Sequence, residues 1–198
     1  ENLVKFTEEL LSTMPPQLNV AFIVNSGSEA NELGMRLAKN FTAQKDMIVS
    51  EAGYHGNTNG CIEISSYKFD GPGGKGVPPH VHVIPIPDVY RGLYRSNDPK
   101  VGSKYASHVL DAVKNIQSQG RGPAAFIFES VISCGGQVEL PKDFLKEAYQ
   151  HVRNAGGVSI ADEVQTGCGR SGDHFWAFQE HGVVPDIVTI GKPIGNGH

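Results

Sequence analysis

Short, mostly apolar runs recur along this chain, and they limit the folds open to it more than any other feature. A strand with one solvated face alternates apolar and polar residues, whereas several of these runs are apolar at nearly every position. Such strands are buried on both faces, which is typical of a parallel sheet covered by helices. The predicted strands are Val20–Val24, Met47–Ser50, Val81–Ile84, Ala124–Phe128, Val158–Asp162 and Asp186–Ile190.

Helical patterns separate these runs, so strand and helix alternate along the chain. Alternation of this kind predicts an α/β fold with a mostly parallel sheet and helices on both faces. The predicted helices have these apolar faces: Leu3, Phe6, Leu10 and Leu11, ending before Pro15-Pro16; Ala30, Leu33, Gly34, Leu37, Ala38 and Phe41; Ala106, Val109, Leu110, Val113 and Ile116, capped by Ser103 and ending at Gly120; and Phe144, Leu145, Ala148 and Val152, opened by Pro141 and closed by Gly156. A Gly- and Pro-rich stretch over residues 71–80 is predicted as a loop.

Size and charge exclude several functional classes. With 198 residues the chain is long enough for one domain with a sizeable core. A net charge of −4 gives no basic field, so we expect no nucleic-acid partner. No apolar run reaches the roughly 20 residues that cross a bilayer, so we expect no membrane partner. The cysteines Cys61, Cys134 and Cys168 form no CxxC pair and predict neither a disulfide framework nor a zinc site, which fits an intracellular compartment, either cytoplasm or mitochondrial matrix.

In a parallel sheet, ligands bind beyond the carboxyl ends of the strands, and Gly27, Glu129, Asp162 and Lys192 follow strands there. The turn Ser26-Gly27-Ser28 leads into a helix, whose free N–H groups and positive dipole end bind phosphate. Turns of this kind also serve only to pack helices. Ser26 and Glu29 have the spacing of a capping box, which would point the Glu29 carboxylate back toward the Ser26 backbone.

The acidic pair Asp162-Glu163 after an apolar run also fits the magnesium-binding strand of a nucleotide hydrolase. That interpretation needs a GxxxxGK loop followed by Ser or Thr, and the chain contains none. Lys192 follows a strand and precedes Pro193, where burial would lower its pKa as a Schiff-base lysine requires, although a lone lysine is usually a surface residue. His80 and His82 lie on one side of an extended segment without a neighbouring carboxylate, so no metal site is predicted.

Four ordered segments together resemble the class III (omega-type) pyridoxal-phosphate aminotransferases. They are Ser26-Gly27-Ser28-Glu29-Ala30-Asn31-Glu32, Tyr54-His55-Gly56, Asp162 to Gly172, and Gly191-Lys192-Pro193-Ile194-Gly195-Asn196-Gly197. The resemblance covers almost the whole chain. It implies that residues 1–198 are part of the large, cofactor-binding domain of fold type I, with an N-terminal segment and a small C-terminal domain absent. Cys168 follows Gly167, where an aromatic residue is common in the family, and we interpret this departure as a packing change.

The resemblance also implies a role for each site residue, with pyridoxal 5'-phosphate as cofactor. Gly27 and Ser28 would hold the phosphate, with Ser26 as a further contact. Tyr54 would stack on the pyridine ring and Val164 would pack on its other face, while Gln165 would bind the ring hydroxyl. Asp162 would pair with the ring nitrogen, Glu129 would lie near the substrate, and Lys192 would carry the aldimine. Asp162 and Lys192 are therefore the expected catalytic residues.

Within the family, Ser66 to Gly76 and Pro87 to Gly92 resemble the branch that holds alanine–glyoxylate aminotransferase relatives and the phospho-lyases for phosphoethanolamine and phosphohydroxylysine. We expect transamination between an amino donor and a 2-oxo acid acceptor, with phospho-lyase activity as the alternative. Lys68 and Lys75 in the Gly-rich segment could approach a substrate phosphate, and a mobile surface loop is the competing interpretation. The family also builds its site across a homodimer. A further alternative is therefore that these 198 residues alone bind the cofactor without catalysing a reaction.

Overall fold

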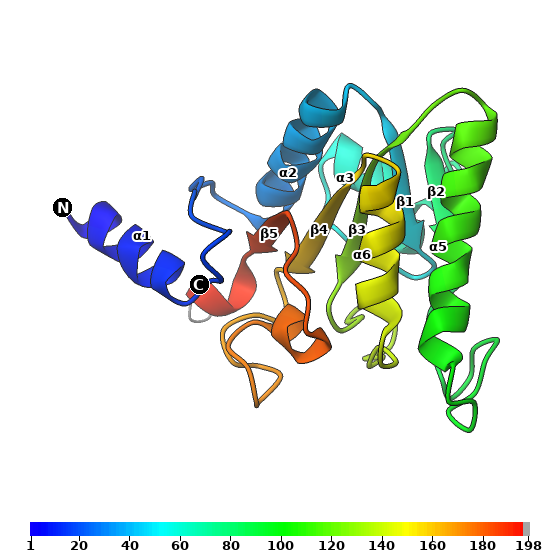
Figure 1. Cartoon of the computed structure of the whole chain (residues 1–198). Coiled ribbons are helices and arrows are strands. Elements are labelled where there is room, and N and C mark those ends of the chain that lie inside the picture. Colours follow the sequence, from blue (N-terminus) through cyan, green and yellow to red (C-terminus); the bar gives the residue numbers. More distant parts are fainter. Residues whose placement is uncertain (196–198) are drawn as a thin grey trace.

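A computed structural model of the chain describes residues 1–195, and within them five strands form one sheet in which every neighbouring pair is parallel. Asn196 and Gly197 of the last predicted motif lie outside these residues. The spatial order is β2-β1-β3-β4-β5, with β3 at the centre (Figure 1). The strands are β1 (Asp46–Ser50), β2 (Val81–Ile84), β3 (Pro123–Glu129), β4 (Val158–Glu163) and β5 (Ile187–Ile190). The predicted α/β fold class is confirmed.

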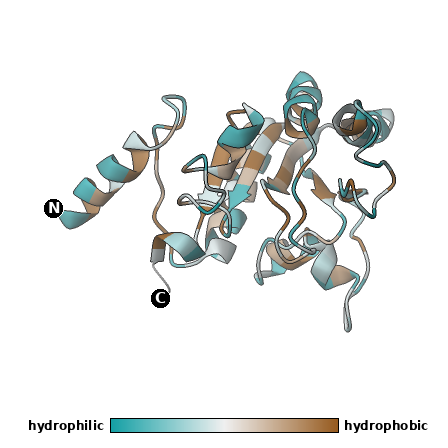
Figure 2. Cartoon of the chain, turned by 90° about the horizontal axis from the view of Figure 1, so that it is seen from below, coloured by the Kyte–Doolittle hydropathy of each residue, from teal (hydrophilic) through white to brown (hydrophobic). Residues whose placement is uncertain are grey.

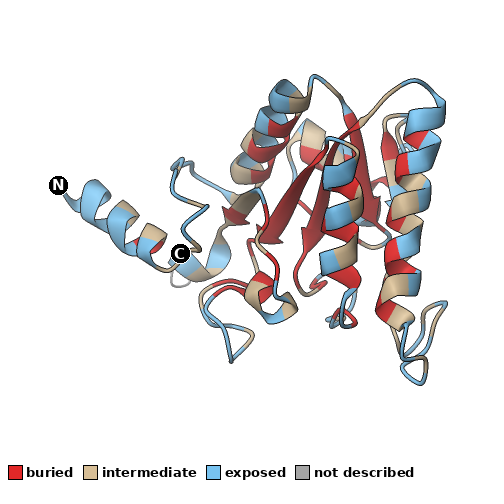
Figure 3. Ribbon diagram, viewed as in Figure 1, coloured by how far each residue is buried: buried red, intermediate tan, exposed pale blue. Residues whose placement is uncertain are grey.

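Helices cover both faces of the sheet, and the residues of the central strand divide between two cores. Ala125 and Ile127 of β3 pack in one core, and Phe126 and Phe128 pack in the other. The first core includes residues of α2 (Gly27–Thr42), α3 (Asn59–Glu63) and α4 (Ser66–Phe69), and the second includes residues of α5 (Val101–Ser118) and α6 (Phe144–Asn154). All seven residues of β3 are buried, as Figure 3 shows, which explains its solidly apolar sequence.

Outside this body, α1 (Asn2–Ser12) extends away from the sheet (Figure 1), and Leu10 is its one buried residue. Two short 3₁₀ helices, η1 (Ala177–His181) and η2 (Lys192–Gly195), flank β5 in the chain. Residues 71–80 contain no helix or strand, as predicted. No helix within residues 1–195 combines the length and the apolar character needed to cross a bilayer.

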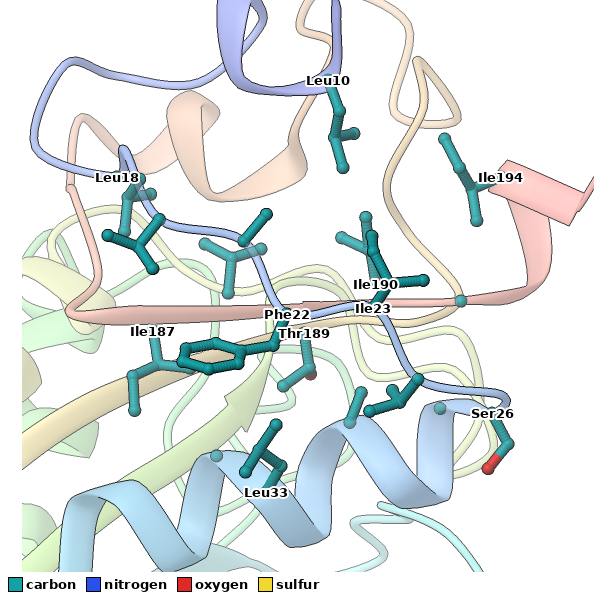
Figure 4. Close-up of a pocket in the computed structure, with 18 of the residues that line it drawn as sticks. Leu10, Leu18, Phe22, Ile23, Ser26, Leu33, Ile187, Thr189, Ile190 and Ile194 are labelled. Atoms are coloured by element: carbon teal, nitrogen blue, oxygen red, sulfur yellow. The ribbon is translucent and has the colours of Figure 1, made fainter. Parts of the chain in front are cut away.

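The prediction of a strand at Val20–Val24 is wrong. The segment is extended but forms no β-ladder with any described strand, and Val20 and Phe22 are 72% and 61% exposed. A strand requires a hydrogen-bonding neighbour, and apolar character alone does not supply one. The segment lines a cavity of about 650 Å³ together with β5 and α2, in which Phe22 lies beside Ile187 and Thr189 (Figure 4). Figure 2 shows apolar residues along this connection.

The predicted inward face of α2 is displaced by one position. Its buried residues are Asn31, Gly34, Met35 and Ala38, whereas Phe41 is 83% exposed and Leu37 is 37% exposed. Leu33 and Leu37 instead line the larger cavity beside β5. The apolar pattern therefore marked two surfaces of one helix, and the surface that faces the sheet carries a buried polar residue, Asn31.

Two predicted helix starts are also wrong. Helix α5 begins at Val101 with Lys100 at its N-cap, and Ser103 instead donates a hydrogen bond to Glu147 of α6 at 2.6 Å. Helix α6 begins at Phe144, because Pro141 belongs to a preceding turn closed by a bond from Phe144 N to Pro141 O. Both errors concern helix ends, where several residues can satisfy the same free backbone groups.

Candidate functional site

The carboxyl ends of the strands enclose a cavity of about 220 Å³. Every predicted site residue except Ser26 lines it, and three residues without a predicted role join them. The lining residues are Gly27, Ser28, Asn31, Tyr54, His55, Gly56, Glu129, Asp162, Val164, Gln165 and Lys192. The fold thus brings together residues that lie up to 165 positions apart (192 minus 27).

The turn at Ser26-Gly27-Ser28 opens α2 at the wall of this cavity. Ser26 Oγ accepts a hydrogen bond from Glu29 N at 3.1 Å, so the cap itself is confirmed. The Glu29 carboxylate accepts from Asn25 N at 2.7 Å rather than from Ser26, which moves the predicted box by one residue. Ser26 lines the larger cavity instead of this one. Within the described residues, the backbone N–H groups of Gly27 and Ser28 donate no hydrogen bond, so they remain free for an anion.

Asp162, near the end of β4, is 4% exposed, and its two carboxylate oxygens have different partners. Oδ1 accepts from Val164 N at 3.0 Å. Oδ2 accepts from Asn31 Nδ2 and from His55 Nδ1, each at 2.8 Å. Because a carboxylate only accepts, His55 carries its proton on Nδ1. Asn31 and His55 belong to the motifs that carried the family resemblance, yet the sequence reasoning gave them no role.

Glu129, at the end of β3, organises the opposite wall. Its Oε1 accepts from Tyr54 N at 3.1 Å, and its Oε2 accepts from Ser133 N at 3.0 Å and from the Ser133 hydroxyl. Gln165 Nε2 donates to the same hydroxyl at 2.5 Å. Glu129 is 4% exposed. Its hydrogen bonds fix the backbone amide of Tyr54 and, through Ser133, the side chain of Gln165.

Tyr54 and Val164 form apolar walls of the cavity. The Tyr54 ring meets Tyr67 edge-on at 5.9 Å between centroids, and Lys68 Nζ lies 5.6 Å from the Tyr54 centroid. Burial raises the pKa of Tyr54, so the phenol stays neutral near pH 7. Val164 packs where Gly27 and Gly191 lack side chains: a Cβ built on either glycine would lie 2.5 or 2.8 Å from Val164 Cγ1. The glycines therefore let the valine approach the start of α2 and the end of β5.

The acidic pair Asp162-Glu163 is divided between the two faces of the sheet, as the pleat of a strand requires. Glu163 is fully buried and accepts from Ala177 N, Phe178 N, Thr166 Oγ1 and Ser130 Oγ. Burial raises its pKa, against the lowering effect of these bonds. Glu163 therefore anchors η1 and does not face the cavity, which removes the paired carboxylates that a magnesium site on this strand would use.

The two histidines singled out in the sequence, His80 and His82, each lie beside a carboxylate, and the carboxylate beside His82 is the buried Asp46. His82 Nε2 lies 2.8 Å from Asp46 Oδ1, and His80 Nε2 lies 3.4 Å from Glu63 Oε2. In the part of the chain that the structure describes, no group of three or more His, Cys, Asp or Glu residues is arranged to hold a metal.

Lys192, the first residue of η2, lines both cavities and is exposed. Within residues 1–195 Lys192 is therefore not buried, contrary to the burial that its position after an apolar strand suggested. The reason is that β5 is an edge strand of the sheet and, within residues 1–195, pairs only with β4, so one side of the strand end stays open there.

Comparisons with known proteins agree on one family. The family profile described as "Aminotransferase class-III" matches residues 1–198. The chain is 48% identical to the Drosophila melanogaster protein "Alanine--glyoxylate aminotransferase 2-like" over all of its own length and 41% of the relative. It is 46% identical to the Caenorhabditis elegans "Ethanolamine-phosphate phospho-lyase homolog 1" over 98% of its length and 44% of the relative.

Among solved structures, a phospholyase from Arthrobacter in complex with phosphoethanolamine superimposes with a TM-score of 0.89 at 37% identity. That match covers 99% of this chain and 46% of the Arthrobacter chain. The chain thus spans less than half the length of the proteins it resembles.

Proposed function

Because this chain belongs to the class III aminotransferase family, whose cofactor is pyridoxal phosphate, we propose that the protein containing it moves an amino group from an amino acid or amine to a 2-oxo acid. The observation that carries the proposal is the meeting of Asp162, Lys192 and the free N–H groups of α2 on one small cavity. These residues come from three separate elements, and only the fold brings them together.

The residues present fit pyridoxal phosphate. A phosphate needs donors, and the N–H groups of Gly27 and Ser28 lie at the start of a 16-residue helix. A flat aromatic ring needs apolar walls, which Tyr54 and Val164 supply. A ring N–H needs a buried acceptor, and Asp162 is one. The donors, the walls and the acceptor line a single cavity, so one molecule can meet all of them.

Bound pyridoxal phosphate supplies an electron sink for negative charge that develops at the substrate Cα. The Asp162 carboxylate, acting at the ring nitrogen, would hold a proton there and so maintain the sink. Lys192 would hold the cofactor, and its amine would move a proton at the substrate Cα. Gln165 would bind the ring hydroxyl, and Glu129 would keep Tyr54 and Gln165 in place on the substrate side. Ser26 supports the phosphate turn through its cap to Glu29 N.

Phospho-lyase activity is the second candidate, and a specific observation favours it. The relatives reported above include proteins named for it, at 46% identity by sequence and a TM-score of 0.89 by structure. Lys68 Nζ lies 5.6 Å from the ring centroid of Tyr54, which lines the cavity, and the Gly-rich stretch of residues 71–76 follows Lys68 in the chain. A cation there would favour a substrate that carries phosphate.

One assay separates the two candidates. The full-length protein is incubated with phosphoethanolamine or phosphohydroxylysine, with and without a 2-oxo acid, and both phosphate and the new amino acid are measured. Transamination predicts an amino acid product that requires the 2-oxo acid. Rapid phosphate release without any acceptor would refute it in favour of the lyase.

The proposal extends to the whole protein. The cavity volume of about 220 Å³ is below the roughly 300–1,000 Å³ of complete small-molecule sites, and Lys192 is exposed. Both observations support a site that is completed by residues outside this chain, including those of a second subunit in a homodimer. They also support the proposal that residues 1–198, as part of a large domain, bind cofactor weakly and turn over little by themselves.

The unpaired cysteines support an intracellular, reducing compartment.

A further inference from the structure

The buried network around Asp162 reaches beyond the residues assigned to the cofactor. Asn31 of α2 is 1% exposed and uses every hydrogen-bonding group of its side chain. Its Nδ2 donates to His55 O and to Asp162 Oδ2, each at 2.8 Å, and its Oδ1 accepts from Thr189 Oγ1 at 2.6 Å. One amide thus joins α2, the loop after β1, β4 and β5.

His55 is the second member of this network. Its side chain is 1% exposed, and its Nδ1 lies 2.8 Å from Asp162 Oδ2. Its backbone N donates to Ser65 Oγ at 2.9 Å, while its backbone O receives the Asn31 amide. The imidazole is therefore held from both sides of its backbone, and its protonated Nδ1 has a fixed direction.

These contacts leave the two oxygens of Asp162 unequal. Oδ2 already accepts two donors, Asn31 and His55. Oδ1 accepts one, Val164 N. Since a carboxylate offers about four acceptor positions over its two oxygens, Oδ1 has the freer position for a further donor. The carboxylate also cannot rotate without breaking bonds to three other residues.

We propose that Asn31 and His55 are positioning residues that saturate Asp162 Oδ2 and present Oδ1 to the cofactor ring nitrogen. This inference rests on the proposed function, because it assigns the ring nitrogen to Asp162. The same amide links the phosphate turn at the start of α2 to β5, whose end carries Lys192. Asn31 thereby keeps three parts of the cofactor site in register: the phosphate turn, the Asp162 carboxylate and the strand β5 that leads to Lys192.

The test compares two ligands on the full-length apoprotein. One is pyridoxal phosphate, and the other is its analogue with the ring nitrogen replaced by C–H, which keeps the phosphate, hydroxyl and aldehyde. The ratio of their dissociation constants isolates contacts at the ring nitrogen. A general loss of folding weakens both ligands and cancels in this ratio.

Asn31→Asp places a second carboxylate against Asp162, and His55→Leu removes the Nδ1 donor. Each substitution should reduce the preference for pyridoxal phosphate over the analogue by roughly 10-fold or more, as expected when a hydrogen bond to a charged group is lost. His55→Asn, whose amide can donate from near the Nδ1 position, should keep more of the preference than His55→Leu. Asn40→Asp, an exposed site in the same helix, is the matched control and should leave the preference unchanged.

If Asn31→Asp and His55→Leu leave the ratio of the two dissociation constants unchanged, either because both ligands weaken equally or because neither weakens, the role of these residues is purely structural and the inference is overturned. If the unsubstituted protein binds neither ligand, the proposed function fails first, and that outcome is distinct from tight binding of pyridoxal phosphate with a ratio that the substitutions do not alter.

Discussion

Replacing Gly27 by Ala tests whether the start of α2 and the loop after β4 are fitted to each other. A Cβ on Gly27 would lie 2.5 Å from Val164 Cγ1 and 3.0 Å from Cγ2. Carbon atoms in contact prefer about 3.5–4.0 Å, so the valine must move by about 1 Å. A Cβ on Gly191 would lie 2.8 Å from the same methyl group, and Val164 is only 9% exposed. The valine therefore has little room, and overpacking of this kind costs about 1–3 kcal/mol.

Val164→Ala removes the methyl groups that the new Cβ would meet. On its own it should cost roughly 1–2 kcal/mol, at about 0.8 kcal/mol for each buried carbon group removed. In the double variant the collision is absent, so Gly27→Ala should add little further cost. The two substitutions should therefore be less than additive by about 1–2 kcal/mol in a double-mutant cycle.

Urea unfolding of the full-length apoprotein, followed by circular dichroism, measures the four free energies of the cycle. Gly34→Ala is the matched control in the same helix, because its Cβ would meet nothing nearer than 3.5 Å. It should be neutral or stabilising by up to about 1 kcal/mol. Additive costs of Gly27→Ala and Val164→Ala would refute the steric coupling.

Three further substitutions follow from single contacts. Ser26→Ala removes the cap on Glu29 N and should cost about 1 kcal/mol in urea unfolding. Glu163→Ala leaves the buried N–H groups of Ala177 and Phe178 without an acceptor, so it should cost at least about 2 kcal/mol and lower the thermal midpoint. Burial alone would raise the pKa of Asp186, but its bonds to Ser159 and Arg153 outweigh this and hold it below 3.8. The stabilisation of the folded state by ionised Asp186 is present above pH 3.8 and is lost as the pH falls through the lower folded-state pKa. The difference in unfolding free energy between wild type and Asp186→Asn should therefore shrink on acidification. A difference that grows on acidification would contradict the assignment.

Much of the sheet could be predicted from the sequence because its signal is local. Strands β3 and β4 are buried at every position, and a run of apolar residues reports that without knowledge of any partner. The same reasoning failed at Val20–Val24, because whether an apolar run becomes a strand depends on a neighbouring strand. The sequence of those five residues does not indicate whether a neighbouring strand is present.

The meeting of Asp162 and Lys192 on one cavity could be predicted, because both follow strands of a parallel sheet. Asn31 and His55 were missed because their roles depend on contacts 131 and 107 positions away along the chain. One sequence signal was present: Asn31 lies at the i−3 and i−7 positions of Gly34 and Ala38, on the face that α2 buries. A polar residue on a buried helix face requires a partner, and the acidic strand end was the available one.

The central claim is that Lys192 holds the cofactor while Asp162 faces its ring. The most direct measurement adds pyridoxal phosphate to the full-length protein, reduces the complex with borohydride, and locates the labelled peptide by mass spectrometry. We expect the label on Lys192, and no label on that peptide in a Lys192→Ala variant. Label on any other lysine of the unsubstituted protein, with Lys192 unmodified, would contradict the account.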